Sequence, residues 1–253
     1  MAGLAPAAEN AVQIITLLAE ESQSLGISEI SRKVDLNKNM VFRILKTLEE
    51  QGWVACHEQK YFLTLVPFQI TSKVLRRMQL NTVATPVVYD LWEKTGESTY
   101  LAVRRNDMAT YIQHLDSIQP VRVAGMLGGQ YPLHCSAPGK VLLAYSTQEY
   151  IDEFLEKPLA KQTGNTIVHA ENLMKELERI RVQGYAVDRE EFSRGIACVA
   201  APVFDYSGKV LGAVGCSGFV PEGKTEEVIQ RLKPHVTEAA DRISGLLGWK
   251  KES

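Results

Sequence analysis

The sequence predicts a mixed α/β (α+β) fold, with a winged helix-turn-helix unit followed by a larger domain built on a mixed or antiparallel sheet. Two patterns predict this class. In residues 1–66, helical spacing of apolar residues recurs before two short strand-like segments. After residue 80, β-branched and aromatic segments alternate with amphipathic helical ones. A length of 253 residues is also enough for two domains.

In the N-terminal part, Asn10 is expected to cap a helix that ends near Glu20, and Ser28 to cap a short helix over 29–34. A further helix over 38–51 places apolar residues at i, i+3, i+4 and i+7, which is the spacing of a buried face. The segments 53–55 and 61–63 are typical of two strands around a polar tip. This order predicts a winged helix-turn-helix over residues 1–66.

A helical pattern over 67–80 then predicts a linker helix, and residues 81–253 a second domain. The segments expected to form strands are 98–104, 109–115, 121–124, 185–187, 196–204 and 209–217, and helices are expected to about residue 94, over 139–144, 172–183 and 225–247. Residues 128–138 are expected to form a loop.

The composition restricts the class of protein. The formal net charge is only −2, so any contact with nucleic acid must come from a local basic patch. The four cysteines are scattered and form no Cys-x-x-Cys pair, which indicates a reducing cytoplasm and neither a disulfide framework nor a local metal site. No signal peptide and no run of about 20 apolar residues is found, so we expect no membrane partner and no cofactor.

A basic patch of this kind lies in the helix-turn-helix. Five basic residues and one acid lie between Arg32 and Lys46. The second helix of such a motif contacts phosphates and base edges, so we expect double-stranded DNA as a partner. The candidate DNA contacts are Arg32, Lys38, Asn39, Met40, Phe42, Arg43 and Lys46. For Phe42, contact with a thymine methyl group and packing against the wing stay as alternatives.

The segment ending in Gly139-Lys140 allows a phosphate-loop hypothesis, but the Gly-x4-Gly-Lys spacing requires glycine where His134 stands. Lys140 is therefore expected to face the surface or to pair with a carboxylate. An enzyme with Cys198, His134 and Asp188 as a nucleophilic set is a second hypothesis, although a thiol within an apolar strand is more often a small buried side chain.

Metal sensing through dispersed ligands is a third hypothesis. Its candidate ligands are His134, Cys135, Asp188 and Cys198. If residues 134 and 135 are extended, however, their side chains point to opposite sides. We therefore predict a protein that is not an enzyme and holds no metal.

A spaced motif in the second domain carries a family resemblance. Residues Gly184, Asp188, Glu191, Cys198 and Ala200 follow the pattern Gly-x3-Asp-x2-Glu-x6-Cys-x-Ala. With the helix-turn-helix segments 27–30 and 43–49, the chain resembles the IclR family of bacterial transcription regulators over nearly its whole length. The resemblance implies a GAF-like effector domain, a homodimer or homotetramer, and a repressor or activator controlled by a small organic acid or aromatic catabolite.

The resemblance also implies an effector site. The residues carried over by position are Ala137, Pro138, Asp188, Ile196, Cys198, Gly215 and Ser217. We expect the helix that starts near Ala137 to offer free backbone N–H groups to a carboxylate. Some relatives have serine where Gly215 stands, so we also expect room for a bulkier or less polar ligand at this position.

Overall fold

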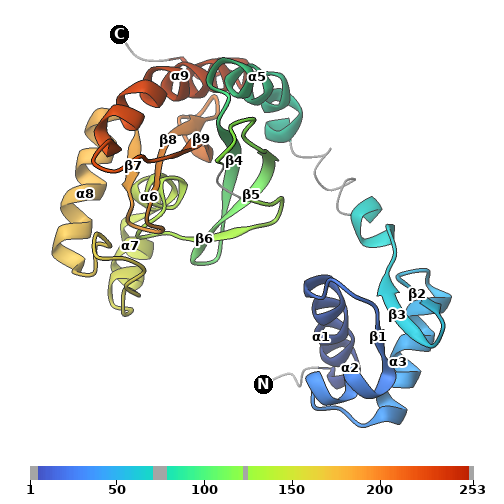
Figure 1. The fold of residues 1–253 in the computed structure, drawn as a ribbon. Coiled ribbons are helices and arrows are strands. Elements are labelled where there is room, and N and C mark those ends of the chain that lie inside the picture. Colours follow the sequence, from blue (N-terminus) through green and yellow to red (C-terminus); the bar gives the residue numbers. More distant parts are fainter. Residues whose placement is uncertain (1–4, 71–78, 122–124, 251–253) are drawn as a thin grey trace. The chain divides into compact units, whose positions relative to one another are not determined.

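The computed structural model describes residues 5–70, 79–121 and 125–250. The chain divides into two compact units, Met1–Arg77 and Met78–Ser253, which are described separately (Figure 1). Part of the predicted linker helix over 67–80 and part of the predicted strand over 121–124 lie outside the described residues, at 71–78 and 122–124.

The N-terminal unit is a winged helix-turn-helix, as the sequence predicts. Its elements are α1 (Pro6–Glu20), β1 (Leu25–Gly26), α2 (Ile27–Lys33), α3 (Lys38–Glu50), β2 (Val54–His57) and β3 (Lys60–Leu63). The strands pair in the antiparallel order β1-β3-β2. Ile14, Ile30 and Leu45, one from each of the three helices, are completely buried in a common core, so burial of one face of each helix holds the unit together.

The ends of these helices differ in part from the expected ones. α1 begins at Pro6, because proline suits the first turn of a helix, so Asn10 lies inside the helix and does not cap it. Before α2 the Glu29 carboxylate accepts the Gly26 N–H at 2.8 Å, so Ser28 is not the cap. α3 begins where predicted because the Asn37 side chain accepts the Met40 N–H at 2.9 Å.

The C-terminal unit is built on an antiparallel sheet. Its elements are α5 (Gln79–Thr95), β4 (Ser98–Arg105), β5 (Met108–Leu115), β6 (Gln130–Pro132), α6 (Ala137–Ala144), α7 (Gln148–Leu155), α8 (Ala170–Gln183), β7 (Ala186–Arg189), β8 (Ile196–Phe204), β9 (Val210–Phe219) and α9 (Thr225–Leu246). The strand order is β6-β5-β4-β9-β8-β7, and every strand pair that the structure describes is antiparallel. Of the two expected sheet types, the antiparallel one is therefore observed.

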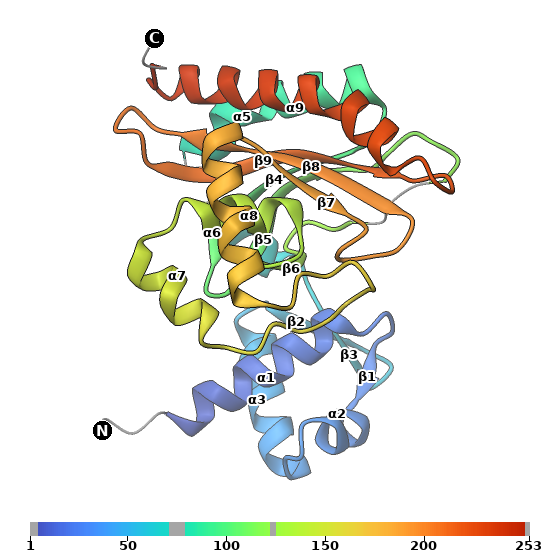
Figure 2. The ribbon, with the colours of Figure 1, turned by 90° about the vertical axis from the view of Figure 1, so that its left-hand side faces the viewer.

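Helices cover both faces of this sheet. α5 and α9 lie side by side on one face, and α6 and α8 lie on the other (Figure 2). Tyr100, Leu133, Leu143, Leu173 and Leu177 are completely buried between the sheet and the α6–α8 layer. Each polar side chain that faces a helix layer therefore needs a partner inside the protein.

One prediction for this unit was wrong, and one helix was missed. Residues 128–138 are not only a loop, because β6 pairs there with β5, and a strand of three residues with a terminal proline is too short to show an alternating pattern. α7 was not predicted, although Ile151 and Phe154 form its buried side. Within the described ranges, no helix is both long and apolar enough to cross a membrane.

Candidate DNA-binding and effector sites

The candidate DNA contacts lie on one exposed surface of the N-terminal unit. One side of α3 is buried in the core through Val41, Leu45 and Leu48. The opposite side carries Lys38, Asn39, Met40, Phe42, Arg43 and Lys46, and Arg32 lies in the last turn of α2; all seven are exposed. The amphipathic spacing of α3 therefore leaves these side chains free to meet a ligand outside the protein.

The charges on this surface are not equally available. The Lys46 ammonium lies 2.9 Å from the Glu49 carboxylate, so contact with a phosphate has to compete with this pair. Arg32, Lys38 and Arg43, by contrast, form no ion pair with any residue in the described part of the chain. These three cations have the properties required for phosphate and base-edge contacts.

Phe42 is an exposed aromatic residue outside the core of the N-terminal unit. It is 45% exposed and belongs neither to the core of the unit nor to the apolar residues that pack against it. Together with Asn10, Met40 and Arg43 it lines a hollow of about 790 Å³ between α1 and α3. The ring is therefore accessible from outside the unit.

In the C-terminal unit, strand register places three predicted effector residues in one line. Asp188 on β7 pairs with Cys198 on β8, and Cys198 pairs with Ser217 on β9. Ser217 pairs in turn with Ser98 on β4, which the sequence did not indicate. We call Asp188, Cys198, Ser217 and Ser98 the polar row; each of its residues is at most 8% exposed.

Two members of the polar row are in close contact. The Cys198 sulfur and the Ser217 hydroxyl oxygen are 3.0 Å apart, which is within hydrogen-bonding distance. The row lies on the face of the sheet that α6 and α8 cover, because Cys198 belongs to that core. Ala137 at the start of α6 is in the same core and Ile196 packs against it, so the structure brings most of the predicted effector residues together.

Gly215 does not leave free space, and this expectation was wrong. A Cβ atom added at residue 215 would lie 2.6 Å from the Tyr100 hydroxyl and 2.3 Å from the Val199 carbonyl oxygen. The Tyr100 ring fills the position, and it stacks on Tyr111 with ring centroids 4.5 Å apart. Tyr111 stacks in turn on Tyr131 at 4.2 Å, so aromatic rings form the wall beside the polar row.

The start of α6 offers few free donors, which corrects a second expectation. The Ser136 hydroxyl accepts the Gly139 N–H at 3.2 Å, and the Ser136 carbonyl accepts the Lys140 N–H at 2.9 Å. Pro138 has no N–H group. Among the described contacts, only the Ala137 N–H of this turn is left without a partner, so the first turn of α6 by itself is a weak anion site.

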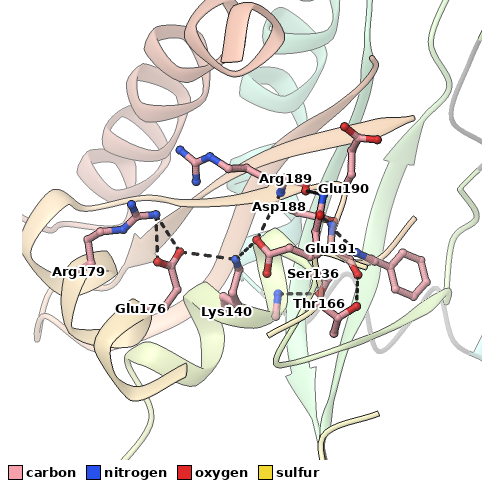
Figure 3. Close-up of polar contacts among 12 residues, drawn as sticks. Ser136, Lys140, Thr166, Glu176, Arg179, Asp188, Arg189, Glu190 and Glu191 are labelled. Carbon is pink, nitrogen blue, oxygen red and sulfur yellow. Dashed lines mark hydrogen bonds and ion pairs between the residues drawn. The ribbon is translucent and has the colours of Figure 1, made fainter. Parts of the chain in front are cut away.

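Lys140 is a buried partner of carboxylates. Its side chain is completely buried, and its ammonium lies 2.5 Å from a Glu191 oxygen and 3.6 Å from a Glu176 oxygen (Figure 3). Glu176 also pairs with Arg179 at 3.0 Å. Of the two expectations for Lys140, pairing with a carboxylate is right. The second Glu191 oxygen is buried and has no hydrogen-bond partner among the described atoms.

The spacing between Asp188 and Glu191 has a structural reason. The Asp188 carboxylate accepts the N–H groups of Glu191 at 2.7 Å and Phe192 at 3.3 Å, which holds the turn after β7. That turn directs the Glu191 side chain to Lys140 (Figure 3). Burial and the nearby Glu191 charge raise the pKa of Asp188 to about 7. Asp188 can therefore change its protonation near neutral pH.

The geometry gives no support to an activated thiol. Burial, to which the Asp188 charge adds, raises the pKa of Cys198 well above its ordinary value, whereas a nucleophilic cysteine needs a lowered one. The His134 ring nitrogen Nε2 lies 2.9 Å from the Ala160 carbonyl oxygen. Burial also raises the pKa of Cys135, to about 12. Across the described residues, no group of His, Cys, Asp or Glu side chains could hold a metal ion.

Two residues of this site, Ser98 and Tyr111, were missed by sequence reasoning. No local pattern indicates them, since only the pairing of β4 with β9 and β5 brings them to the site. Lys140 could have been placed at the site from the sequence, because it is the charged residue of an otherwise apolar helix.

A winged helix-turn-helix joined to an antiparallel domain with a buried polar site defines a transcription regulator that responds to a ligand. The IclR helix-turn-helix domain model matches residues 7–56, and the model described as "Bacterial transcriptional regulator IclR C-terminal" matches residues 72–245. The chain therefore belongs to the IclR family. The protein is a DNA-binding transcription regulator with a C-terminal effector-binding domain.

Individual relatives agree with this assignment. The transcriptional regulator KdgR of Escherichia coli K12 is 34% identical over 239 residues, which cover 93% of this chain and 90% of KdgR. The crystal structure of Thermotoga maritima IclR has a TM-score of 0.81 and 29% identity and covers 96% of this chain and 99% of its own. KdgR is an HTH-type transcriptional regulator.

One neighbour carries a ligand. The IclR homologue of Microbacterium hydrocarbonoxydans, solved in complex with 4-hydroxybenzoate, has a TM-score of 0.84 and covers 95% of this chain and 98% of its own. Its sequence identity is 21%, so this likeness shows the fold alone.

Proposed function

We propose that the polar row binds the effector, and that the effector is a small organic acid or aromatic compound that carries a hydroxyl group. The alignment of Asp188, Cys198 and Ser217 in one buried line is the observation that carries this proposal. Carboxyl, thiol and hydroxyl groups can all bond a ligand hydroxyl, and the adjacent tyrosine rings suit a flat ligand. The 4-hydroxybenzoate bound by the Microbacterium homologue has this chemistry.

The DNA partner is proposed to be a two-fold symmetric operator bound by a homodimer or by pairs within a homotetramer in the cytoplasm. Helix-turn-helix dimers place their second helices in successive major grooves, so half-sites are expected about 10 base pairs, or a multiple of this, apart. Arg32, Lys38 and Arg43 supply cations that no acid of the described chain neutralises. The protein has no catalytic role in this proposal.

Effector binding is proposed to change operator affinity, because a ligand shifts a conformational balance only by its different affinity for the two states. The test measures binding to the DNA next to the protein's own gene, at fixed salt, with and without small carboxylates and aromatic acids. We expect a ligand of this panel to change the operator Kd of the wild type.

The same titration in variants tests the site. Ser217→Ala should remove most of the ligand response and leave the ligand-free Kd unchanged. Cys216→Ala is the matched control, since Cys216 is the neighbour of Ser217 on the opposite face of β9, against Thr95 and Thr99. An equal loss of response in both variants would indicate a folding effect, and a full response in Ser217→Ala would remove the polar row as the effector site.

A further inference from the structure

The C-terminal unit has a hollow on its surface, away from the polar row. It has a volume of about 1060 Å³ and is bordered by the end of α8, the segment between α8 and β7, the end of β8 and the turn after it, α9, and the residues after α9. None of the polar-row residues lines it, because β8 contributes Ala201, Pro202 and Phe204 and not Cys198. Its size is sufficient for a small organic ligand.

Aromatic rings form its walls. Phe204 stacks on Trp249 with centroids 4.7 Å apart and an interplanar angle of 22°. Tyr145 meets Phe204 edge to face at 5.4 Å. Tyr185 and Tyr206 also line the hollow, and Tyr206 is 81% exposed. Exposed and partly exposed rings grouped in one concave surface are typical of a site for a flat ligand.

The charge of this hollow is unbalanced. Arg181, Lys233 and Lys250 line it, against the one lining carboxylate, Asp241. None of these three cations forms an ion pair with a residue that the structure describes. Elsewhere on α9, by contrast, Arg231 pairs with Glu97 at 2.6 Å and Arg242 with Asp90 at 2.7 Å. The cations of the hollow therefore remain available to an anion.

Two of these cations are held in place. The Arg181 Nε donates to the Ala144 carbonyl oxygen at 2.5 Å, which fixes the guanidinium at the end of α6. The Lys233 ammonium lies 4.9 Å from the centre of the Tyr185 ring. A cation that is already positioned loses less side-chain entropy when it binds an anion. We call this hollow, with its rings and its three cations, the cationic aromatic groove.

We propose that the cationic aromatic groove is a second ligand site, which takes a small ring-bearing organic anion and prefers a dianion. The rings hold the flat part of the ligand, and Arg181 and Lys233 bond its acid groups. The proposal does not depend on which ligand the polar row binds. It predicts two independent ligand sites in one effector domain.

The test is isothermal titration of the full-length protein with terephthalate, benzoate and benzyl alcohol, which are a dianion, a monoanion and a neutral ring. We expect terephthalate to bind most tightly and benzyl alcohol most weakly. Added salt should weaken the binding of the two anions and leave the binding of benzyl alcohol unchanged. In Arg181→Gln/Lys233→Gln, terephthalate affinity should fall by about tenfold or more, because two charge-assisted bonds are lost. Lys175→Gln, which removes an exposed charge elsewhere on α8, is the matched control and should bind as the wild type does.

Three further variants locate the binding. Asp188→Asn and Ser217→Ala should leave terephthalate affinity unchanged, and Trp249→Phe should remove the change in tryptophan fluorescence caused by the ligand, since the other tryptophans, Trp53 and Trp92, do not line the groove. The proposal is overturned by unchanged affinity in Arg181→Gln/Lys233→Gln, by loss of binding in Asp188→Asn, or by absence of binding to the wild type at millimolar terephthalate.

Discussion

The Lys140 ammonium lies 2.5 Å from a Glu191 carboxylate oxygen, and the Lys140 side chain is completely buried. This pair connects α6 to the turn after β7, the same turn that the Asp188 carboxylate holds. A buried ion pair is costly to break, because the remaining charge has neither water nor a partner. Lys140 and Glu191 therefore fix the position of the α6 helix relative to the polar row.

Lys140→Met is expected to lower the free energy of unfolding by about 3–5 kcal/mol, since it leaves buried carboxylates without their cation. The double variant Lys140→Met/Glu191→Leu should lose less unfolding free energy than the sum of the losses in the two single variants. The reason is that the second substitution removes the carboxylate that the first leaves without its cation. Urea unfolding followed by circular dichroism measures both.

The control for this pair is Lys94→Met. The Lys94 ammonium lies 2.9 Å from the Glu238 carboxylate, but both side chains are about half exposed, at 45% and 51%. Loss of this exposed ion pair should therefore lower the free energy of unfolding by less than about 1 kcal/mol. A Lys140→Met variant that is no less stable than Lys94→Met would contradict a structural role for the buried pair.

The raised pKa of Asp188 predicts a pH dependence of stability. Because its pKa is about 7 in the folded protein and about 4 in the unfolded chain, ionisation is disfavoured by folding. Its contribution to stability is complete below pH 4 and is lost as the pH rises to 7. Asp188→Asn should therefore become more stable relative to the wild type over this range, by a few kcal/mol, since one pKa unit is about 1.4 kcal/mol.

The comparison is made by urea unfolding of both proteins at pH 4, 5.5 and 7.5. Asp205→Asn is the control, because hydrogen bonds from Ser207 lower the pKa of the exposed Asp205 carboxyl, so its contribution is lost only below about pH 4 and should change little over the measured range. If the stability difference between Asp188→Asn and the wild type is constant with pH, Asp188 does not have a raised pKa.

Sequence patterns predict those parts of this protein that local spacing determines. The buried side of α3 follows from apolar residues at helical spacing, and the motif from Gly184 to Ala200 indicated the line of Asp188 and Cys198. Ser98 could not be found in this way, because its place beside Ser217 depends on pairing between strands far apart in the sequence. The packing of Tyr100 over Gly215 is also tertiary, and no local pattern encodes it.

Gly215→Ala is expected to destabilise the C-terminal unit. The new methyl group would lie 2.3 Å from the Val199 carbonyl oxygen and 2.6 Å from the Tyr100 hydroxyl, so the neighbouring strand and the ring must both move. Insertion of a group into a packed core costs about 1–3 kcal/mol. Gly164→Ala is the matched control, since a Cβ there meets nothing within 4 Å, and it should change stability by less than about 0.5 kcal/mol. Equal unfolding midpoints for the two variants would show that the space beside Gly215 is free.

On the DNA-binding surface, substitutions of the neighbouring residues Arg43 and Phe42 should weaken operator binding in different ways. Arg43→Ala should weaken operator binding by about 1–3 kcal/mol and reduce the slope of log Kd against log salt by about one, because a cation is lost. Phe42→Ala should weaken binding and leave this slope unchanged, since contact between a ring and a thymine methyl group releases no counterion.

Fluorescence anisotropy with labelled operator, over a series of salt concentrations, measures both quantities. Because Phe42 is 45% exposed and outside the core, Phe42→Ala should retain the melting temperature of the wild type, which separates a contact from a folding effect. Lys175→Ala removes a charge from the other unit and should change neither affinity nor slope. Wild-type affinity in Phe42→Ala would exclude the ring from the DNA interface, and an unchanged slope in Arg43→Ala would do the same for the cation.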